Sequence, residues 1–106
     1  MKPCIAYITT KSNKEAKQIA RLLIEKKVAA CVNIIDNMNS LYMWEGKLVD
    51  ETETVIIAKT RESVMDKLIR YVKENHSDSC PCVIALPVTN GNKEYLDWIV
   101  KETTLF

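Results

Sequence analysis

The residues of this chain that are best suited to metal chemistry lie near position 80. His76, Cys80 and Cys82 fall within seven residues, and two thiols beside an imidazole are soft ligands that suit Cu(I) or Zn(II). If residues 80 and 82 are both extended, their side chains point to the same side of the strand. The alternative is that Cys82 fills an apolar or interface slot, Cys80 is an exposed loop thiol and His76 caps a helix C-terminus. This alternative is preferred, because lone thiols in strands usually serve packing.

A second candidate site consists of aromatic and charged residues that could line a pocket between subunits: Tyr42, Trp44, Glu51, Glu53 and Lys59. They lie in residues 29–60, where side chains alternate with the period of two that marks β-strands. Gly46 supplies the positive φ that a tight turn at residues 44–47 requires. Each arm of this hairpin has about a dozen residues, roughly twice the usual strand length, so the excess must be exposed or pair with another chain. The simpler interpretation is that the aromatics are interface contacts and the carboxylates form salt bridges or solvated edges.

Composition narrows the classes of function. The chain has 106 residues, 47% of them hydrophobic, and is expected to form one domain over residues 1–106. Fifteen Lys and Arg offset fourteen Asp and Glu, so no charge excess favours nucleic acid or a membrane as a partner. One histidine and two glycines leave little catalytic equipment, so we expect a protein that is not an enzyme and has no organic cofactor. Without an export segment, Cys4 and Cys31 are expected to be small buried residues in strands.

The periodicity of the chain predicts the elements that position these candidates. Ser12 and Glu15 form a capping-box pattern that begins a helix, and Thr60 is the expected N-cap of a second helix. The expected elements outside the hairpin are strands at residues 3–10 and 82–88 and helices at residues 12–27, 60–76 and 95–102. The order β-α-β-β-α-β plus a C-terminal helix predicts an α+β fold, a ferredoxin-like split βαβ sandwich. Its first and third strands would be central, with the second and fourth at the edges.

The ordered set of motifs along the chain resembles one known family. The motifs are AACVN at 29–33, SLYMWEGK at 40–47, KT at 59–60, His76, Pro81, ALPV at 85–88 and GNKEYLDWI at 91–99. Together they are similar to the CutA family of divalent-cation tolerance proteins over nearly the whole chain. The resemblance implies a cytoplasmic homotrimer in which the hairpin arms pair with neighbouring subunits, linked to tolerance of copper and other divalent ions. Because such trimers resemble nitrogen-regulatory signalling proteins, the alternative is a small-molecule sensor or signalling scaffold.

The family's metal ligands carry over only in part. Copper binding in some members is attributed to a cysteine in the first strand, which falls at Ile8, and to two histidines, which fall at Asn75 and His76. The family's Pro-Tyr-x-x-Pro-Glu continuation reads SDSCPC at 77–82 here, so Cys82 stands where the glutamate would be. The prediction is therefore weak binding of copper or another divalent ion, with His76, Cys80 and Cys82 as the candidate ligands.

Overall fold

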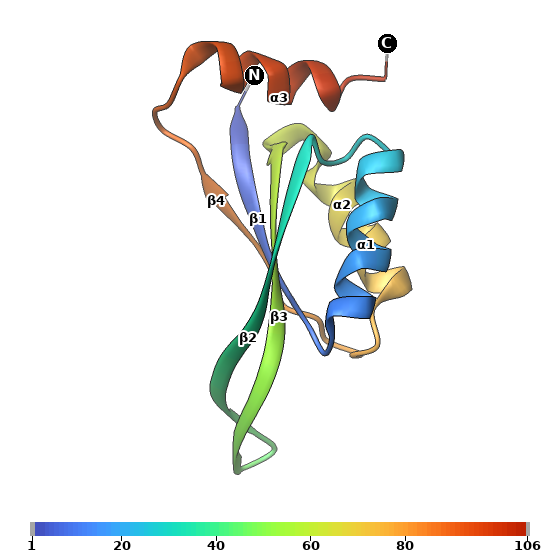
Figure 1. Cartoon of the computed structure of the whole chain (residues 1–106), viewed down its shortest axis with the longest axis vertical. Helices are drawn as coiled ribbons and strands as arrows, with labels where there is room; N and C mark the ends of the chain where they lie inside the picture. Colours follow the sequence, from blue (N-terminus) through green and yellow to red (C-terminus); the bar gives the residue numbers. More distant parts are fainter. Residues whose placement is uncertain (1, 106) are drawn as a thin grey trace.

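The computed structural model describes residues 2–105, and its centre is a four-stranded sheet (Figure 1). The strands run in the order β2-β3-β1-β4, and every neighbouring pair is antiparallel. This order confirms that the first and third strands are central and that the second and fourth are edges. The strands are β1 (Pro3–Thr10), β2 (Cys31–Trp44), β3 (Lys47–Arg61) and β4 (Val83–Pro87). The helices are α1 (Asn13–Glu25), α2 (Met65–Asn75) and α3 (Lys93–Glu102), with a 3-10 turn, η1 (Glu62–Val64), before α2.

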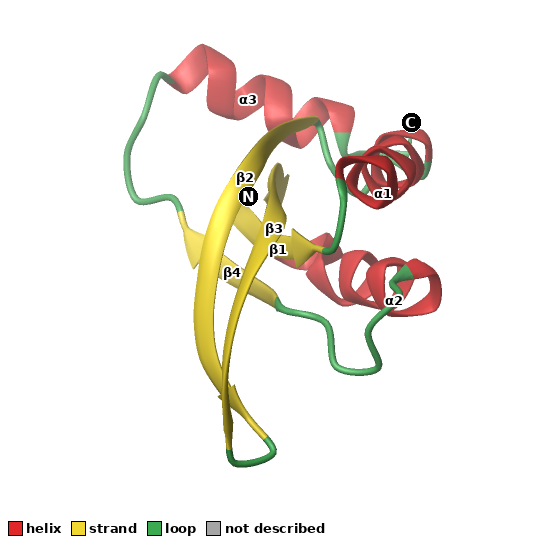
Figure 2. Cartoon of the chain, turned by 60° about the horizontal axis from the view of Figure 1, so that its bottom comes forward, coloured by secondary structure: helices red, strands yellow, loops and turns green. Residues whose placement is uncertain are grey.

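One face of the sheet is covered by α1 and α2, which lie on the same side of the strands (Figure 2). Every second residue of β1 is buried against these helices, including Ala6 and Ile8. The helices contribute residues at helical spacing, such as Leu23 from α1 and Leu68 and Val72 from α2. The alternating residues of the strands and the helically spaced residues of α1 and α2 therefore pack into one hydrophobic core.

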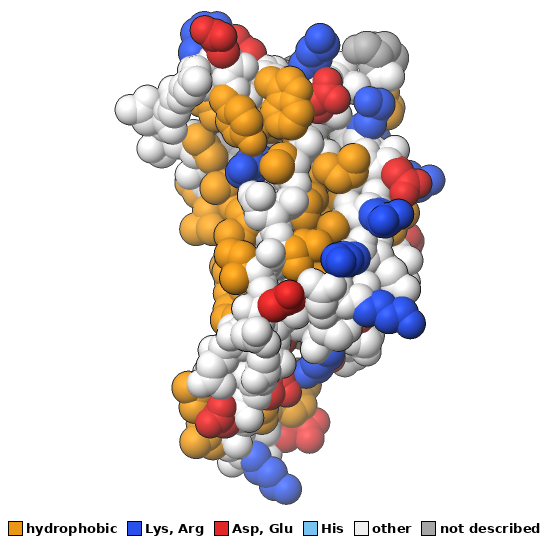
Figure 3. All heavy atoms as spheres, in the orientation of Figure 1, with side chains coloured by type: hydrophobic (Ala, Val, Ile, Leu, Met, Phe, Trp, Pro, Cys, Tyr) orange, Lys and Arg blue, Asp and Glu red, His pale blue; other side chains and the backbone are white. Residues whose placement is uncertain are grey.

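The opposite face of the sheet, here called the open face, has no covering helix over most of its length. Three of its apolar residues are about half exposed: Ile35 at 51%, Ile84 at 55% and Leu86 at 48%. Figure 3 shows hydrophobic side chains gathered over the strands and beside α3. The α3 helix crosses one end of the sheet, where Arg61 donates hydrogen bonds to Thr103 at 2.8 and 2.9 Å. No helix among residues 2–105 is both long enough and apolar enough to cross a membrane.

The hairpin of β2 and β3 extends well beyond the helices (Figure 1). Its arms have 14 and 15 residues, and their pairing continues to Trp44 opposite Lys47. The turn places Glu45 and Gly46 at φ angles of 51° and 79°, the left-handed region that a two-residue hairpin loop requires. The predicted long hairpin with a turn at residues 44–47 is confirmed.

A β-bulge in β2 changes which side chains face the open face. Ile35 is opposite Val55, but the next pair is Met38 opposite Glu53, so β2 carries one extra residue. Asn37 adopts a φ of 59° there, a conformation that asparagine tolerates better than most residues. Because side chains alternate, one extra residue moves all later residues of β2 to the other face. Tyr42 therefore joins Met38 on the open face.

Three local predictions need correction. Thr60 is not a helix cap, because it lies inside β3 and its hydroxyl donates to the buried backbone carbonyl of Val28 at 2.7 Å. The strand β3 continues to Arg61 because its pairing with β1 extends to Pro3 opposite Arg61. Helical structure begins only at η1. Cys4 is buried as expected, whereas Cys31 at the sheet edge is only half-buried. The last strand begins at Val83, one residue later than predicted.

Candidate functional site

A groove of about 930 Å³ lies on the open face, between the hairpin, the end of β1 and the loop that precedes β4. Its lining brings residues of both predicted sites together, because Cys80 and Cys82 share it with Tyr42, Trp44 and Glu53. Lining residues that the sequence did not suggest are Tyr7, Thr9, Lys11, Met38 and Asp78. Five of the eight predicted site residues thus line one groove, whereas His76, Glu51 and Lys59 are not part of its lining.

Three elements position this lining. Alternation in β1 directs Ile8 into the core and leaves Tyr7 on the open face. The bulge in β2 places Met38 on the same face, where its Sδ accepts a hydrogen bond from the Tyr7 hydroxyl at 3.2 Å. The loop over residues 77–82 closes the third side. The Asp36-Asn37 pair, weak in strand propensity, was the signal that could have revealed the bulge.

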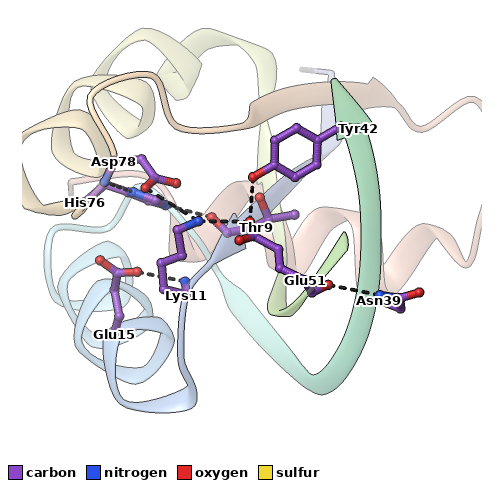
Figure 4. Close-up of polar contacts among 8 residues, drawn as sticks. All are labelled: Thr9, Lys11, Glu15, Asn39, Tyr42, Glu51, His76 and Asp78. Atoms are coloured by element: carbon purple, nitrogen blue, oxygen red, sulfur yellow. Dashed lines mark hydrogen bonds and ion pairs between the residues drawn. The ribbon is translucent and has the colours of Figure 1, made fainter. Parts of the chain in front are cut away.

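A charged network connects the hairpin to the end of β1, and Figure 4 shows its side chains pointing toward one another. The Lys11 ammonium lies 2.9 Å from Oε1 of Glu51, and the Tyr42 hydroxyl donates to the same oxygen at 2.6 Å. The hydrogen bonds from Tyr42 and then Lys11 lower the pKa of Glu51. The hydrogen bond to Glu51 likewise raises the pKa of Tyr42 and that of Lys11. Asp78 lies 3.9 Å from the Lys11 ammonium, so the network reaches the loop.

His76 holds the loop against β1 (Figure 4). Its Nδ1 accepts a hydrogen bond from the backbone N–H of Asp78 at 2.9 Å, and its Nε2 lies 2.7 Å from the carbonyl oxygen of Thr9. Since Nδ1 accepts, Nε2 carries the proton and donates to Thr9. Both ring nitrogens are therefore in use. His76 is the C-cap residue of α2, as the alternative predicted, and its ring bonds to the backbone of β1.

Glu15 also holds the beginning of the same loop. The Ser12 hydroxyl accepts from the N–H of Glu15 at 3.2 Å, which is one half of the predicted capping box. The Glu15 carboxylate completes no bond to Ser12 and accepts instead from the N–H groups of Lys11 at 3.0 Å and Ser77 at 2.7 Å. Partial burial raises the pKa of Glu15, but the hydrogen bonds from Ser77 and Lys11 outweigh it and hold this pKa below its ordinary value.

Glu53 is the most enclosed charged group of the groove. Its side chain continues the open-face alternation of β3, and the residue is only 7% exposed. Within residues 2–105 its carboxylate has no hydrogen bond and no ion pair. No fully buried side-chain oxygen in that part of the chain lacks a partner, so the Glu53 oxygens must keep some exposure. Glu53 is one of the residues that line the groove.

The two thiols of the groove are both exposed and unpaired. The carbonyl of Cys82 accepts a hydrogen bond from the N–H of Thr9 at 3.4 Å, which extends the pairing of β1 and β4 by one residue. Cys82 is therefore not packed in the core, while Cys80 is the exposed loop thiol that the alternative predicted. Ile8, at the family's cysteine position, is fully buried on the helix-covered face.

The described residues contain no cluster of three or more His, Cys, Asp or Glu side chains placed to hold one metal ion. Two soft thiols sharing a groove fit an ion that needs few ligands, such as Cu(I). Lys59, predicted to line the pocket, lies outside the groove. Its ammonium is 5.4 Å from the ring centroid of Tyr95 in α3 and 4.0 Å from Sγ of Cys31.

Comparison with known proteins identifies the family. Residues 4–102 match the family described as CutA1 divalent ion tolerance protein. Protein CutA 1, chloroplastic, from Oryza sativa is 47% identical over 102 residues, which are 95% of this chain and 58% of that protein. The chain thus spans little more than half the length of that relative.

Solved structures agree with this result. The crystal structure of CutA1 from Oryza sativa superposes with a TM-score of 0.95 at 40% identity and covers 100% of this chain and 97% of that chain. A structure of the periplasmic divalent cation tolerance protein CutA from Archaeoglobus fulgidus gives a TM-score of 0.93 at 43% identity, covering 96% and 99%. The chain belongs to the CutA1 family of divalent ion tolerance proteins.

Proposed function

We propose that this chain acts in divalent-cation tolerance as a homotrimer that binds copper or another divalent ion weakly and catalyses no reaction. The observation that carries the metal-binding part is the pair of exposed thiols, Cys80 and Cys82, in one groove. Thiolates are soft ligands that favour Cu(I). His76, the third predicted ligand, would have to give up one of its two hydrogen bonds to coordinate an ion. Its role in this proposal is to hold the loop that carries the thiols.

Competition titration of reduced protein with a chromophoric Cu(I) chelator tests the metal site. Cys80→Ser and Cys82→Ser are each expected to weaken Cu(I) binding by about 10- to 100-fold. Cys31→Ser is the matched control, since its half-buried thiol lies in β2 and does not line the groove. Unchanged affinity in both groove variants would remove these thiols from the proposal.

The proposed trimer buries the open face against neighbouring copies. The half-exposed Ile35, Ile84 and Leu86 support this, as does the long edge strand β2, whose outer backbone groups have no partner strand. We also propose the ferredoxin-like assignment, because α1 and α2 cover one face of a sheet with β1 and β3 in its centre. Native mass spectrometry is expected to give three chains of 12.1 kDa.

Substitutions sharpen the test of assembly. Ile84→Asp should dissociate the trimer, whereas Ile24→Asp on exposed α1 should leave its mass unchanged. A stable monomer of the natural chain at micromolar concentration would overturn the proposal.

A cytoplasmic location is a further part of the proposed function, supported by four unpaired cysteines, which suit a reducing compartment. Recovery of the protein outside the cytoplasmic fraction would contradict that location.

A second candidate function is a small-molecule sensor or signalling scaffold. The groove favours it, because about 930 Å³ lies in the size range of ligand pockets and aromatic and charged groups converge there. A thermal-shift screen with a broad metabolite panel tests this role, since a ligand that binds only the folded state raises the melting temperature. No shift with any compound would count against it.

A further inference from the structure

The loop that connects β4 to α3 contains Asn90 and Gly91, the one Asn-Gly pair in the sequence. Residues 89–92 are exposed, and Figures 1 and 2 both show this connection curving away from the sheet. Asn90 and Gly91 also line a hollow of about 660 Å³ beside α3. Water therefore reaches both residues, at a place that shares no residue with the groove.

The Asn90 side chain is folded against the backbone nitrogen that follows it. Its Oδ1 accepts a hydrogen bond from the N–H of Gly91 at 2.8 Å, so the carbon that carries Oδ1, Cγ, is held beside the same nitrogen. Within residues 2–105 no second hydrogen bond restrains this amide. A bond between the Gly91 nitrogen and Cγ closes a five-membered ring. Such an intramolecular attack is greatly accelerated when the two atoms are already held in contact.

Asn39 shows how the fold protects an asparagine that lies elsewhere. It precedes Ser40 within β2, and its Nδ2 donates to Asp50 at 2.7 Å and to the carbonyl of Glu51 at 3.1 Å. These bonds turn the amide toward β3 and away from the next backbone nitrogen. The arrangement at Asn90 is therefore not shared by every exposed asparagine of the chain.

The fold does not require glycine at position 91. The φ angle of Gly91 is outside the left-handed region, and a Cβ placed there would lie 3.4 Å from Cδ1 of Leu96, an ordinary van der Waals distance. The missing side chain matters to the nitrogen instead, because a Cβ on the residue that follows Asn90 would crowd the approach of Cγ. Position 91 thus favours the ring closure without being needed for the turn.

We propose that Asn90 is a site of spontaneous deamidation in the folded chain. The Gly91 nitrogen loses its proton and forms a bond to Cγ of Asn90, while the bond from Cγ to Nδ2 breaks and ammonia leaves with a proton. Water then opens the resulting succinimide ring. Opening between Cγ and the nitrogen gives aspartate, and opening at the former peptide bond gives isoaspartate, whose main chain passes through Cγ. The sum is water consumed and ammonia released, so no oxidant or cofactor is needed.

The modification acts on the seating of α3. Either product adds a negative charge two residues before Asn92, whose side chain caps the helix by accepting from the N–H of Glu94 at 3.1 Å. Isoaspartate also lengthens the connection by a methylene group. The first turn of α3 carries Tyr95, whose ring centroid lies 5.4 Å from the Lys59 ammonium of β3. A longer connection shifts this turn relative to the sheet.

Peptide mapping by mass spectrometry tests the proposal on the reduced full chain, kept in its native assembly at mildly alkaline pH in heavy-oxygen water. Asn90 is expected to lose ammonia and take up a heavy oxygen atom about tenfold or more faster than Asn39. Part of the product should be methylated by an isoaspartyl methyltransferase. Gly91→Ala should slow the reaction at position 90 by about tenfold or more. Asn90→Gln, whose longer side chain disfavours ring closure, should abolish it, which keeps the test decisive if Gly91→Ala does not fold.

Three outcomes would overturn the inference. If Asn90 stays intact in the folded protein, whatever its fate in urea, the fold protects it and the site does not exist. An unchanged rate in a natively folded Gly91→Ala would exclude attack by an uncrowded Gly91 nitrogen. Aspartate formed without isoaspartate would mean that water hydrolyses the amide directly and that no ring is closed.

Discussion

Replacing His76 by alanine separates a structural histidine from a metal ligand. The substitution removes the hydrogen bond from Nε2 to the Thr9 carbonyl, at 2.7 Å, and the one from the Asp78 N–H to Nδ1, at 2.9 Å. Each such bond contributes roughly 1 kcal/mol net, so the unfolding free energy should fall by about 2 kcal/mol. For a domain of this size that corresponds to a decrease in melting temperature of roughly 8–15 °C.

Urea denaturation followed by circular dichroism, with EDTA and reductant present, measures this loss. Protein concentration must be the same for all variants, because the stability of an oligomer depends on it. His76→Gln is the matched variant: its amide can donate to Thr9 but offers no acceptor in the position of Nδ1. We expect it to recover about half of the loss.

Copper titration of the same variants provides the second readout. If His76 only holds the loop, His76→Ala should bind Cu(I) nearly as well as the natural chain. A stability change within about 0.5 kcal/mol would refute the structural role, since that is the range of ordinary surface substitutions. A loss of copper affinity as large as that of Cys82→Ser would show that the imidazole is a ligand after all.

Three further substitutions test other parts of the fold. Burial raises the pKa of Glu15, but the hydrogen bonds that its carboxylate accepts lower this pKa by more, so the net value lies below the ordinary 4.5. The ionised carboxylate therefore contributes its full stabilisation above about pH 4.5, and this contribution is lost as the pH falls through the lowered pKa. Glu15→Gln should cost about 1 kcal/mol at pH 7 by urea denaturation, with a gap that closes below about pH 4.5; a constant gap would contradict this. Asn37→Val should cost about 1–2 kcal/mol because φ is 59° there, while Asn37→Gly should be nearly neutral; equal effects would show that the bulge conformation is not the cause. Thr60→Val should cost about 1–2 kcal/mol by leaving the buried Val28 carbonyl unpaired, and Thr60→Ser, which keeps the hydroxyl, should restore most of it; a neutral Thr60→Val would mean that the hydrogen bond contributes nothing.

Much of the fold could be predicted because its signals are local. Alternation in residues 3–10, the Gly46 turn and the helical spacing of Ala16, Ile19 and Leu23 each reflect contacts within a few residues of sequence. The order of the elements then allowed few sheet topologies. The Thr60 cap failed because a long-range bond to Val28 and pairing with β1 outweighed a local preference.

The candidate site could be predicted only in pieces. Tyr42 and Cys82 were each singled out, but their common groove depends on the register of β2 and on the path of residues 77–82. The spacing of residues in the sequence specifies neither this register nor the path of the loop. Lys59 was grouped with them because it lies on the same predicted hairpin, where the second arm ends, yet β3 is so long that one end lines the groove and the other contacts α3.

One extra residue in β2 connects the fold to the site. If the ladder ran without the bulge, Asn39, Leu41 and Met43 would face the open side, and Tyr42 would point toward the helix-covered side. The hydroxyl of Tyr42 could not then share Oε1 of Glu51 with Lys11, and the wall beside Glu53 would lose an aromatic ring. The bulge is therefore required both for the contact of Tyr42 and Lys11 with Glu51 and for the presence of the Tyr42 ring in the groove lining.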